Sequence, residues 1–258
     1  MIDTDLIRHS LKTRSLGKKI YSFETIDSTN TFARTLGEDE SPHGTLIVAE
    51  EQTAGRGRQG RRWQSQRGKN LLLSIVFRTP FIHERARMLP FAAALAAADG
   101  AEHFTHCPVE CKWPNDLMIE KRKFAGMLIE AVTQNDSVTC VIMGVGINVN
   151  QTEFPDDIRN RATSLRVHEE NDIDRVLLLC GFMEELEHRL KQLRQFSPQL
   201  LLDEWKRRAT MFGSTITLTE QAGQSSARAV DVAPNGALVI EDENGVRREV
   251  FAGDVSLS

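Results

Sequence analysis

The sequence predicts an α+β protein in two parts, a mixed central β-sheet flanked by helices over residues 1–212 and a small all-β barrel over residues 213–258. Three features support this division. Two near-continuous apolar segments are typical of strands that are buried on both faces of a sheet. Alanine-rich and amphipathic segments of helical length can cover such a sheet. After Phe212, short strands separated by turn residues follow.

The strands of the first part are identified by their apolar pattern and by the residues that end them. Residues 20–26 alternate apolar and polar side chains, as a half-buried strand does. Pro114 lacks a backbone N–H and ends the strand before it, which leaves Lys112 at the strand's end. Gly144 and Gly146 mark places where another group can approach a strand closely. The predicted strands are 20–26, 45–50, 70–78, 109–112, 117–120, 124–132 and 137–149.

The helices of the first part are identified by capping residues and apolar faces. Asp27 or Ser28 is a natural N-cap, and a helix start of this kind either serves only to cap the helix or also holds a polar or anionic ligand group. Asp172 is the expected cap of a later helix with one apolar face. The polar segment 150–170 predicts a long, mobile loop. The predicted helices are 28–36, 88–103, 172–193 and 198–208.

The second part shows four short strands joined by turn residues. Asn244-Gly245 is a typical hairpin turn, and Pro234-Asn235-Gly236 is a second turn signal. The predicted strands are 215–219, 227–232, 237–241 and 246–251.

The composition predicts an ordinary globular protein of the cytoplasm. The 258 residues are 40% hydrophobic and 26% charged, with a net charge of −4. No apolar run is long enough to span a bilayer, and residues 1–19 mix charges without the apolar centre of a signal peptide. Four cysteines form no disulfide pattern. His103, His106, Cys107 and Cys111 are spaced too irregularly for a structural zinc site and are interpreted as core or surface residues.

Residues 55–69 are the most unusual segment. Six basic side chains and four glycines lie here without an acid, although the whole chain is acidic. Arginine suits carboxylates and phosphates, and glycine lets the backbone approach a ligand. We therefore predict a mobile loop that closes over an anionic, phosphate-bearing small molecule. A dinucleotide-binding turn, a nucleic-acid-binding segment and a plain surface loop remain as alternatives. A P-loop is excluded, because Asn70 follows Gly68-Lys69.

Several motifs, in this order, make the chain resemble the biotin protein ligases. The resemblance covers roughly residues 20–258, and it implies that the terminal barrel is SH3-like. The matching segments are Asp27-Ser28-Thr29-Asn30, Gln52 to Trp63 with Gly55-Arg56-Gly57-Arg58 at its centre, Lys112-Trp113-Pro114-Asn115-Asp116-Leu117, Arg122-Lys123-x-Ala125-Gly126 and Gly144-Val145-Gly146-Ile147-Asn148.

The resemblance implies roles for individual residues. Lys112 and Arg58 would be catalytic, and Asp116 would be a candidate ligand of Mg²⁺. Residues 150–170 would cover the adenine. Biotin would contact Ser28, Thr29, Asn30, Gln52, Arg56, Gly57, Arg58 and Lys112. ATP and the adenylate would contact Arg56, Arg58, Lys112, Asn115 and Asn148.

The same resemblance implies an ATP-dependent reaction in two steps. Biotin would be activated as biotinyl-5′-AMP and then transferred to a lysine of a biotin carboxyl carrier protein. About 19 residues precede the first predicted strand, so we expect no sequence-specific DNA binding, and no membrane contact. A monomer or a homodimer is equally compatible with the sequence. Lipoate ligation and non-enzymatic binding of a small molecule or nucleic acid are the alternative functions.

Overall fold

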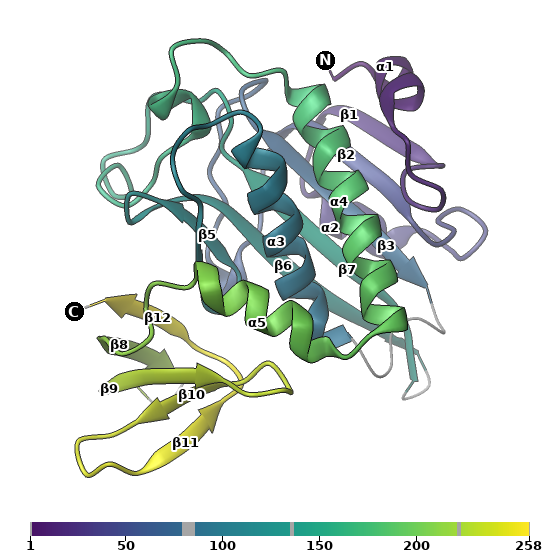
Figure 1. Cartoon of the computed structure of the whole chain (residues 1–258). Coiled ribbons are helices and arrows are strands. Elements are labelled where there is room, and N and C mark those ends of the chain that lie inside the picture. Colours follow the sequence, from purple (N-terminus) through teal and green to yellow (C-terminus); the bar gives the residue numbers. More distant parts are fainter. Residues whose placement is uncertain (1, 79–85, 135–136, 221–222, 258) are drawn as a thin grey trace.

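The computed structural model describes residues 2–78, 86–134, 137–220 and 223–257. Its larger part is built on a seven-stranded sheet with the order β1-β2-β3-β7-β6-β5-β4 (Figure 1). β1 and β2 are parallel and the other neighbouring pairs are antiparallel, so the sheet is mixed, as predicted. The strands are β1 (Ile20–Ile26), β2 (Thr45–Gln52), β3 (Leu71–Arg78), β4 (Glu110–Lys112), β5 (Asp116–Ile119), β6 (Arg122–Gln134) and β7 (Ser137–Ile147).

Helices cover this sheet on both faces. α3 (Leu89–Glu102) and α4 (Arg175–Gln195) pack on one face and enclose the main core (Figure 1). The short helix α2 (Thr29–Thr35) lies on the other face, where Ala33 packs with Val76 and other strand residues in a smaller cluster. Side chains of β3 therefore alternate between the two faces, as the period of a strand requires.

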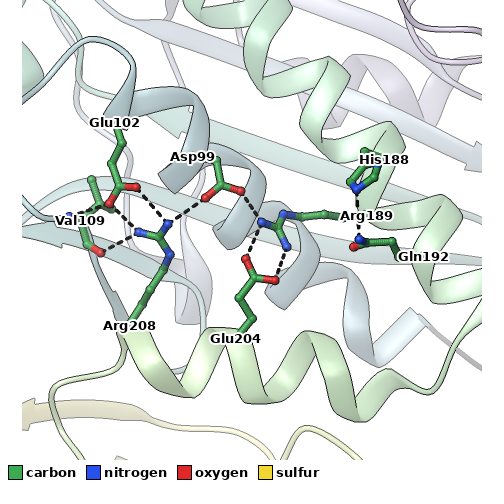
Figure 2. Close-up of polar contacts among 8 residues, drawn as sticks. All are labelled: Asp99, Glu102, Val109, His188, Arg189, Gln192, Glu204 and Arg208. Carbon is green, nitrogen blue, oxygen red and sulfur yellow. Dashed lines mark hydrogen bonds and ion pairs between the residues drawn. The ribbon is translucent and has the colours of Figure 1, made fainter.

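A charge network around the buried Arg189 holds α5 (Pro198–Arg208) against the other helices (Figure 2). Arg189 of α4 pairs with Asp99 of α3 and, at 2.7 Å, with Glu204 of α5. Arg208 at the end of α5 pairs with Asp99 at 2.8 Å and donates to the carbonyl of Val109 at 3.5 Å. Because Val109 directly precedes β4, the network also holds the start of that strand.

The smaller part is an antiparallel five-stranded sheet with the order β11-β10-β9-β8-β12. This arrangement confirms the predicted small β-structure. α5 leads into it and lies between it and the main sheet (Figure 1). The strands are β8 (Thr215–Glu220), β9 (Gly223–Val232), β10 (Leu238–Glu241), β11 (Arg247–Val250) and β12 (Asp254–Leu257).

Four details differ from the sequence prediction. The N-terminal helix α1 (Thr4–Ser10) and strand β12 were not predicted. Asp174 rather than Asp172 caps α4, and its carboxylate accepts hydrogen bonds from two backbone N–H groups of the first turn. The expected loop 150–170 contains a short 3₁₀ helix, η3 (Leu165–His168). None of the described helices has the length and apolar character needed to cross a membrane.

Candidate functional site

A cavity of about 600 Å³ opens on the face of the main sheet that carries α2. Two glycines of β7 keep part of its wall free of side chains. A Cβ atom at Gly144 would lie 2.5 Å from Oδ1 of Asn30, and one at Gly146 would lie 2.5 Å from Cε2 of Trp63. These glycines therefore allow the close approach that the sequence predicted for them.

The start of α2 contributes a group of buried polar residues to the cavity wall. Ser28, Thr29 and Asn30 are each at most 3% exposed. Oε1 of Gln52 accepts a hydrogen bond from the backbone N–H of Thr29 at 2.7 Å, and Ser74 Oγ donates to Asn30 Oδ1 at 2.6 Å. Ser28 also caps the helix. The structure thus brings together the four residues that the resemblance implies for recognition of the biotin head group.

The glycine–arginine loop, residues 55–69, folds back on itself beside the cavity. The N–H of Gly57 donates to the carbonyl of Arg61 at 2.7 Å, and the N–H of Trp63 donates to the carbonyl of Gly55 at 3.0 Å. At the tip, residues 58–60 form one 3₁₀ turn. A dinucleotide-binding turn would need a full helix directly after the glycines, so this alternative is wrong.

Three arginines of the loop connect it to different parts of the molecule. Arg56 Nη1 lies 3.3 Å from Oε1 of Glu130, the carboxylate that also accepts a hydrogen bond from Asn30. Arg58 Nη1 donates to Oδ1 of Asn115 at 3.3 Å. The third, Arg61, forms an ion pair with Asp254 of β12 in the small sheet. Arg56 and Arg58 both line the cavity.

Lys112 is the last residue of β4 and lines the same cavity. Its ammonium makes no hydrogen bond or ion pair of its own within the described ranges, although Asp116 influences it electrostatically. Asn115, three residues further on, is fixed by backbone pairing with Met127, whose N–H donates to the Asn115 carbonyl at 3.0 Å. The Trp113–Pro114 peptide bond between them is cis.

The two cations at the centre of the cavity are partly withdrawn from water. Burial lowers the pKa of the Lys112 ammonium, and Asp116 and Asp254 act in the opposite direction. Burial likewise lowers the pKa of the Arg58 guanidinium, and the same two carboxylates, Asp116 and Asp254, act to raise it. An anion that enters the cavity would restore favourable interactions to both cations.

Two residues that line the cavity carry buried polar atoms without partners. Asn148 is buried, and its Nδ2 donates to the carbonyl of Thr163 at 3.0 Å. Asn148 Oδ1 and Trp63 Nε1 are buried and have no hydrogen-bond partner among the described residues. Because buried polar atoms are usually satisfied, both are available to a ligand. Residues 158, 161 and 162 of the expected loop also line the cavity here.

The small sheet contributes directly to the site. Asp254 of β12 lines the cavity and pairs with Arg61 of the loop. Trp113, next to Lys112, donates its Nε1–H to the carbonyl of Gly236 at 3.2 Å. Sequence reasoning did not identify this contribution, because the partners are far apart in the chain.

Asp116 is the one residue that the resemblance implies as a metal ligand. Asp116 lines the cavity, but its Oδ1 lies 2.6 Å from Nζ of Lys123, so it is already paired with a cation. His103 and His106 are exposed and Cys111 is buried in the core, which agrees with the interpretation of these three residues as surface and core, whereas Cys107 is half-buried and lies near Glu120 and His168.

Three further residues at the site were given no role from the sequence: Trp63 and Lys123 line the cavity, whereas Glu130 does not line it but pairs with Arg56, which does. Trp63 packs on Gly146 and Gly126, and Lys123 Nζ lies 5.4 Å from the centre of its ring. Trp63 and Lys123 both belong to motifs that the chain shares with the biotin protein ligases, and this membership could have pointed to a role for them. Glu130, in contrast, carried none, since a single glutamate in a strand is not informative.

Two family models match the chain. The biotin/lipoate A/B protein ligase family matches residues 22–148, and the biotin protein ligase C-terminal domain matches residues 211–258.

Individual relatives match over nearly the whole chain. The bifunctional ligase/repressor of Bacillus spizizenii is 34% identical over 97% of this chain and 78% of its own length. The biotin–[acetyl-CoA-carboxylase] ligase of Mycobacterium tuberculosis is 32% identical over 99% of this chain and 98% of its own. The solved structure of the biotin protein ligase from Aquifex aeolicus in complex with biotin and ATP superimposes with a TM-score of 0.81 at 30% identity, covering 93% of this chain and 99% of that one.

Proposed function

The chain belongs to the biotin protein ligases, and on that premise we propose how its residues carry out the reaction. It is an ATP-dependent ligase that attaches biotin to protein. In the proposed first step a carboxylate oxygen of biotin attacks the α-phosphate of ATP, a new P–O bond forms, and pyrophosphate leaves. In the second step a neutral lysine amine attacks the biotinyl carbonyl, an amide forms, and AMP leaves with the bonding electron pair.

The polar group at the start of α2 would hold the biotin head group. Ser28, Thr29, Asn30 and Gln52 offer donors and acceptors that are already oriented by mutual hydrogen bonds. Such preorganised groups recognise an uncharged polar ring system without reorganising. The bare backbone at Gly144 gives Asn30 the room to take this position.

Lys112 and Arg58 would act on the reacting atoms. Both line the cavity, and both are cations whose pKa is lowered by burial. Bringing a carboxylate toward a triphosphate requires positive charge between the two, and Lys112 supplies it without a competing partner. Arg56 and Arg58 would then lie along the phosphate, with Gly57 between them, and hold the adenylate away from water.

Asn115 and Asn148 would contact the nucleotide end. Asn115 already accepts a hydrogen bond from Arg58, and Asn148 Oδ1 is free to accept one from a ligand. Residues 150–170, of which Ile158, Arg161 and Ala162 line the cavity, would cover the base.

Mg²⁺ would arrive with the phosphates of ATP. Asp116 offers one carboxylate in the cavity, and magnesium is commonly bound by one or two carboxylates together with substrate phosphates. Bound there, the ion would neutralise phosphate charge, while Lys123 would release its pairing with Asp116.

The protein substrate would be a biotin carboxyl carrier protein, and residues 213–258 would form a separate domain that contributes Asp254 to the site. The observation that carries the proposal is that Arg58 and Lys112 line the same cavity, part of whose wall is formed by Gly144 and Gly146.

The experiment is ATP–pyrophosphate exchange with biotin or lipoate as the acid, together with the melting temperature for each acid in the presence of ATP. Biotin-dependent exchange and a larger stabilisation by biotin support the proposal. Exchange with lipoate alone would assign the chain to the lipoate branch of the family, and exchange with neither acid would indicate a non-enzymatic binder.

A further inference from the structure

Three potential metal ligands gather outside the cavity just described. They are Cys107, between α3 and β4, Glu120, in the turn between β5 and β6, and His168, in η3. One ligand atom of each lies within 4.8 Å of the others. None of the three lines the cavity. The three segments are far apart in the sequence, so the fold itself assembles the group.

The surroundings of His168 are those of a metal-binding histidine. Its side chain is 5% exposed, and its Nε2 lies 2.9 Å from Oγ1 of Thr163. The other ring nitrogen, Nδ1, lies 3.9 Å from Oε2 of Glu120. A metal-bound histidine usually has its second nitrogen fixed by a hydrogen bond in this way.

The other two ligands leave room for an ion and for its adjustment. Cys107 is half-buried and forms no disulfide. The Glu120 side chain is 64% exposed, so it can move by the roughly 1 Å that separates the present spacing from the ligand–ligand distance of a tetrahedral zinc site. Its Oε2, the oxygen that faces His168, also accepts a hydrogen bond from Arg122 at 3.3 Å, and rotation of the exposed carboxylate would pass this contact to Oε1 while Oε2 binds the metal.

We propose that Cys107, Glu120 and His168 bind one divalent cation of the zinc class. A thiolate and an imidazole favour zinc over magnesium or calcium, which prefer oxygen ligands alone. Three protein ligands leave a fourth position for water.

The proposed ion would fasten residues 150–170 to the strands beneath them. Thr163, the partner of His168, also accepts a hydrogen bond from Asn148 through its carbonyl and donates its N–H to the carbonyl of Lys123 at 2.9 Å. The ion would therefore stabilise the wall of the cavity without touching a ligand in it.

The test is metal binding by the whole chain, prepared without a histidine tag and stripped with a chelator. Native mass spectrometry measures zinc stoichiometry, and cobalt(II) reports a thiolate ligand through its charge-transfer absorption. We expect one zinc ion per chain and a thiolate–cobalt band. Thr163→Val should weaken zinc binding about 10- to 100-fold, the range for loss of a hydrogen bond to a ligating histidine.

Variants decide the assignment. Cys107→Ser and Glu120→Gln should each reduce zinc affinity, and Cys107→Ser should abolish the cobalt band. His106→Gln, at an exposed histidine next to Cys107, should leave both unchanged. Absence of zinc binding, or equal binding by Cys107→Ser and the parent, would overturn the proposal. Because no turnover is measured, neither result depends on the catalytic roles proposed above.

Discussion

The Arg58 guanidinium donates a hydrogen bond to the side-chain oxygen of Asn115 at 3.3 Å, and this contact joins the tip of the glycine–arginine loop to the segment that follows β4. The two residues are 57 positions apart in the chain. Lys112 lines the same cavity three residues before Asn115. Loop and strand end are therefore placed to act on one bound anion.

Replacing Arg58 by glycine should release the adenylate prematurely. The substitution removes a cation from the cavity and the contact with Asn115, but no buried core side chain. We expect faster loss of biotinyl-adenylate into solution and biotin on lysines of bystander proteins. Labelling of serum albumin, followed by mass spectrometry, measures this.

A matched control is Arg67→Gly in the same loop. Arg67 is 57% exposed, pairs with Glu24 and does not line the cavity. This variant should retain the adenylate as the parent does. Equal retention by the Arg58 and Arg67 variants would contradict the role given to Arg58.

The pH dependence of adenylate formation should report the Lys112 ammonium. Burial lowers its pKa, Asp116 and Asp254 raise it, and Lys123 and Arg61 lower it further. Since the lysine loses its proton as pH rises through this lowered pKa, activity should fall at a lower pH than an ordinary lysine would give. The kcat/KM for biotin in pyrophosphate exchange measures it, because the carrier lysine takes no part. Lys112→Arg should move the fall in activity to higher pH. If the fall stays at the same pH, another group causes it.

Adding a methyl group at Gly144 should weaken biotin binding. The new Cβ would lie 2.5 Å from Oδ1 of Asn30 and displace a buried side chain from its hydrogen bonds with Ser74 and Glu130. A loss of about 1–3 kcal/mol is usual for such a disruption, which is roughly 5- to 150-fold in affinity. Calorimetric titration with biotin is the measurement.

Gly181→Ala is the control for this substitution. Gly181 lies within α4, and nothing stands within 4 Å of its added Cβ. Alanine there should leave biotin binding unchanged and raise the free energy of unfolding by up to about 1 kcal/mol. If Gly144→Ala binds biotin as tightly as Gly181→Ala does, the missing side chain at Gly144 has no part in biotin recognition.

Asp254→Asn should loosen the loop from the small sheet. Asp254 pairs with Arg61, whose side chain is 60% exposed, so the interaction contributes at most about 1 kcal/mol. We expect the adenylate to dissociate up to about fivefold faster, as measured by rapid gel filtration of the complex. The control is Asp231→Asn. Asp231 also lies in the small sheet, in β9, but pairs with Lys206 of α5, so its loss should leave the rate unchanged. Identical rates for both variants would exclude Asp254 as a loop contact.

The strands of the main sheet were predictable because a buried strand leaves a strong apolar pattern, and β3 and β7 lie within a few residues of their predicted bounds. α1 was missed because its only buried side chain is Ile7, too little for a periodic pattern. β12 is four residues long and is held by pairing with β8, which nothing local reveals.

The cavity was predictable where its residues stand in motifs and unpredictable where they meet through the fold. Ser28, Arg58 and Lys112 belong to quoted motifs, and the structure brings them to one place. Glu130 and Asp254 pair with arginines of the loop. These partners are far apart in the sequence, and only the tertiary structure brings them together. The pairing of Asp116 with Lys123 was likewise not foreseen.

The most direct test of the central claim is transfer of biotin to a biotin carboxyl carrier domain, in the presence of ATP and Mg²⁺, by the Lys112→Ala variant. Lys69→Ala is its control, because Lys69 lies outside the cavity and pairs with Asp172. We predict that the parent and Lys69→Ala each add the mass of one biotin to the carrier. Lys112→Ala should fold normally yet form the adenylate about 10²–10³ times more slowly, as after loss of one charge-stabilising group. Labelling by Lys112→Ala at the rate of the parent would contradict the account.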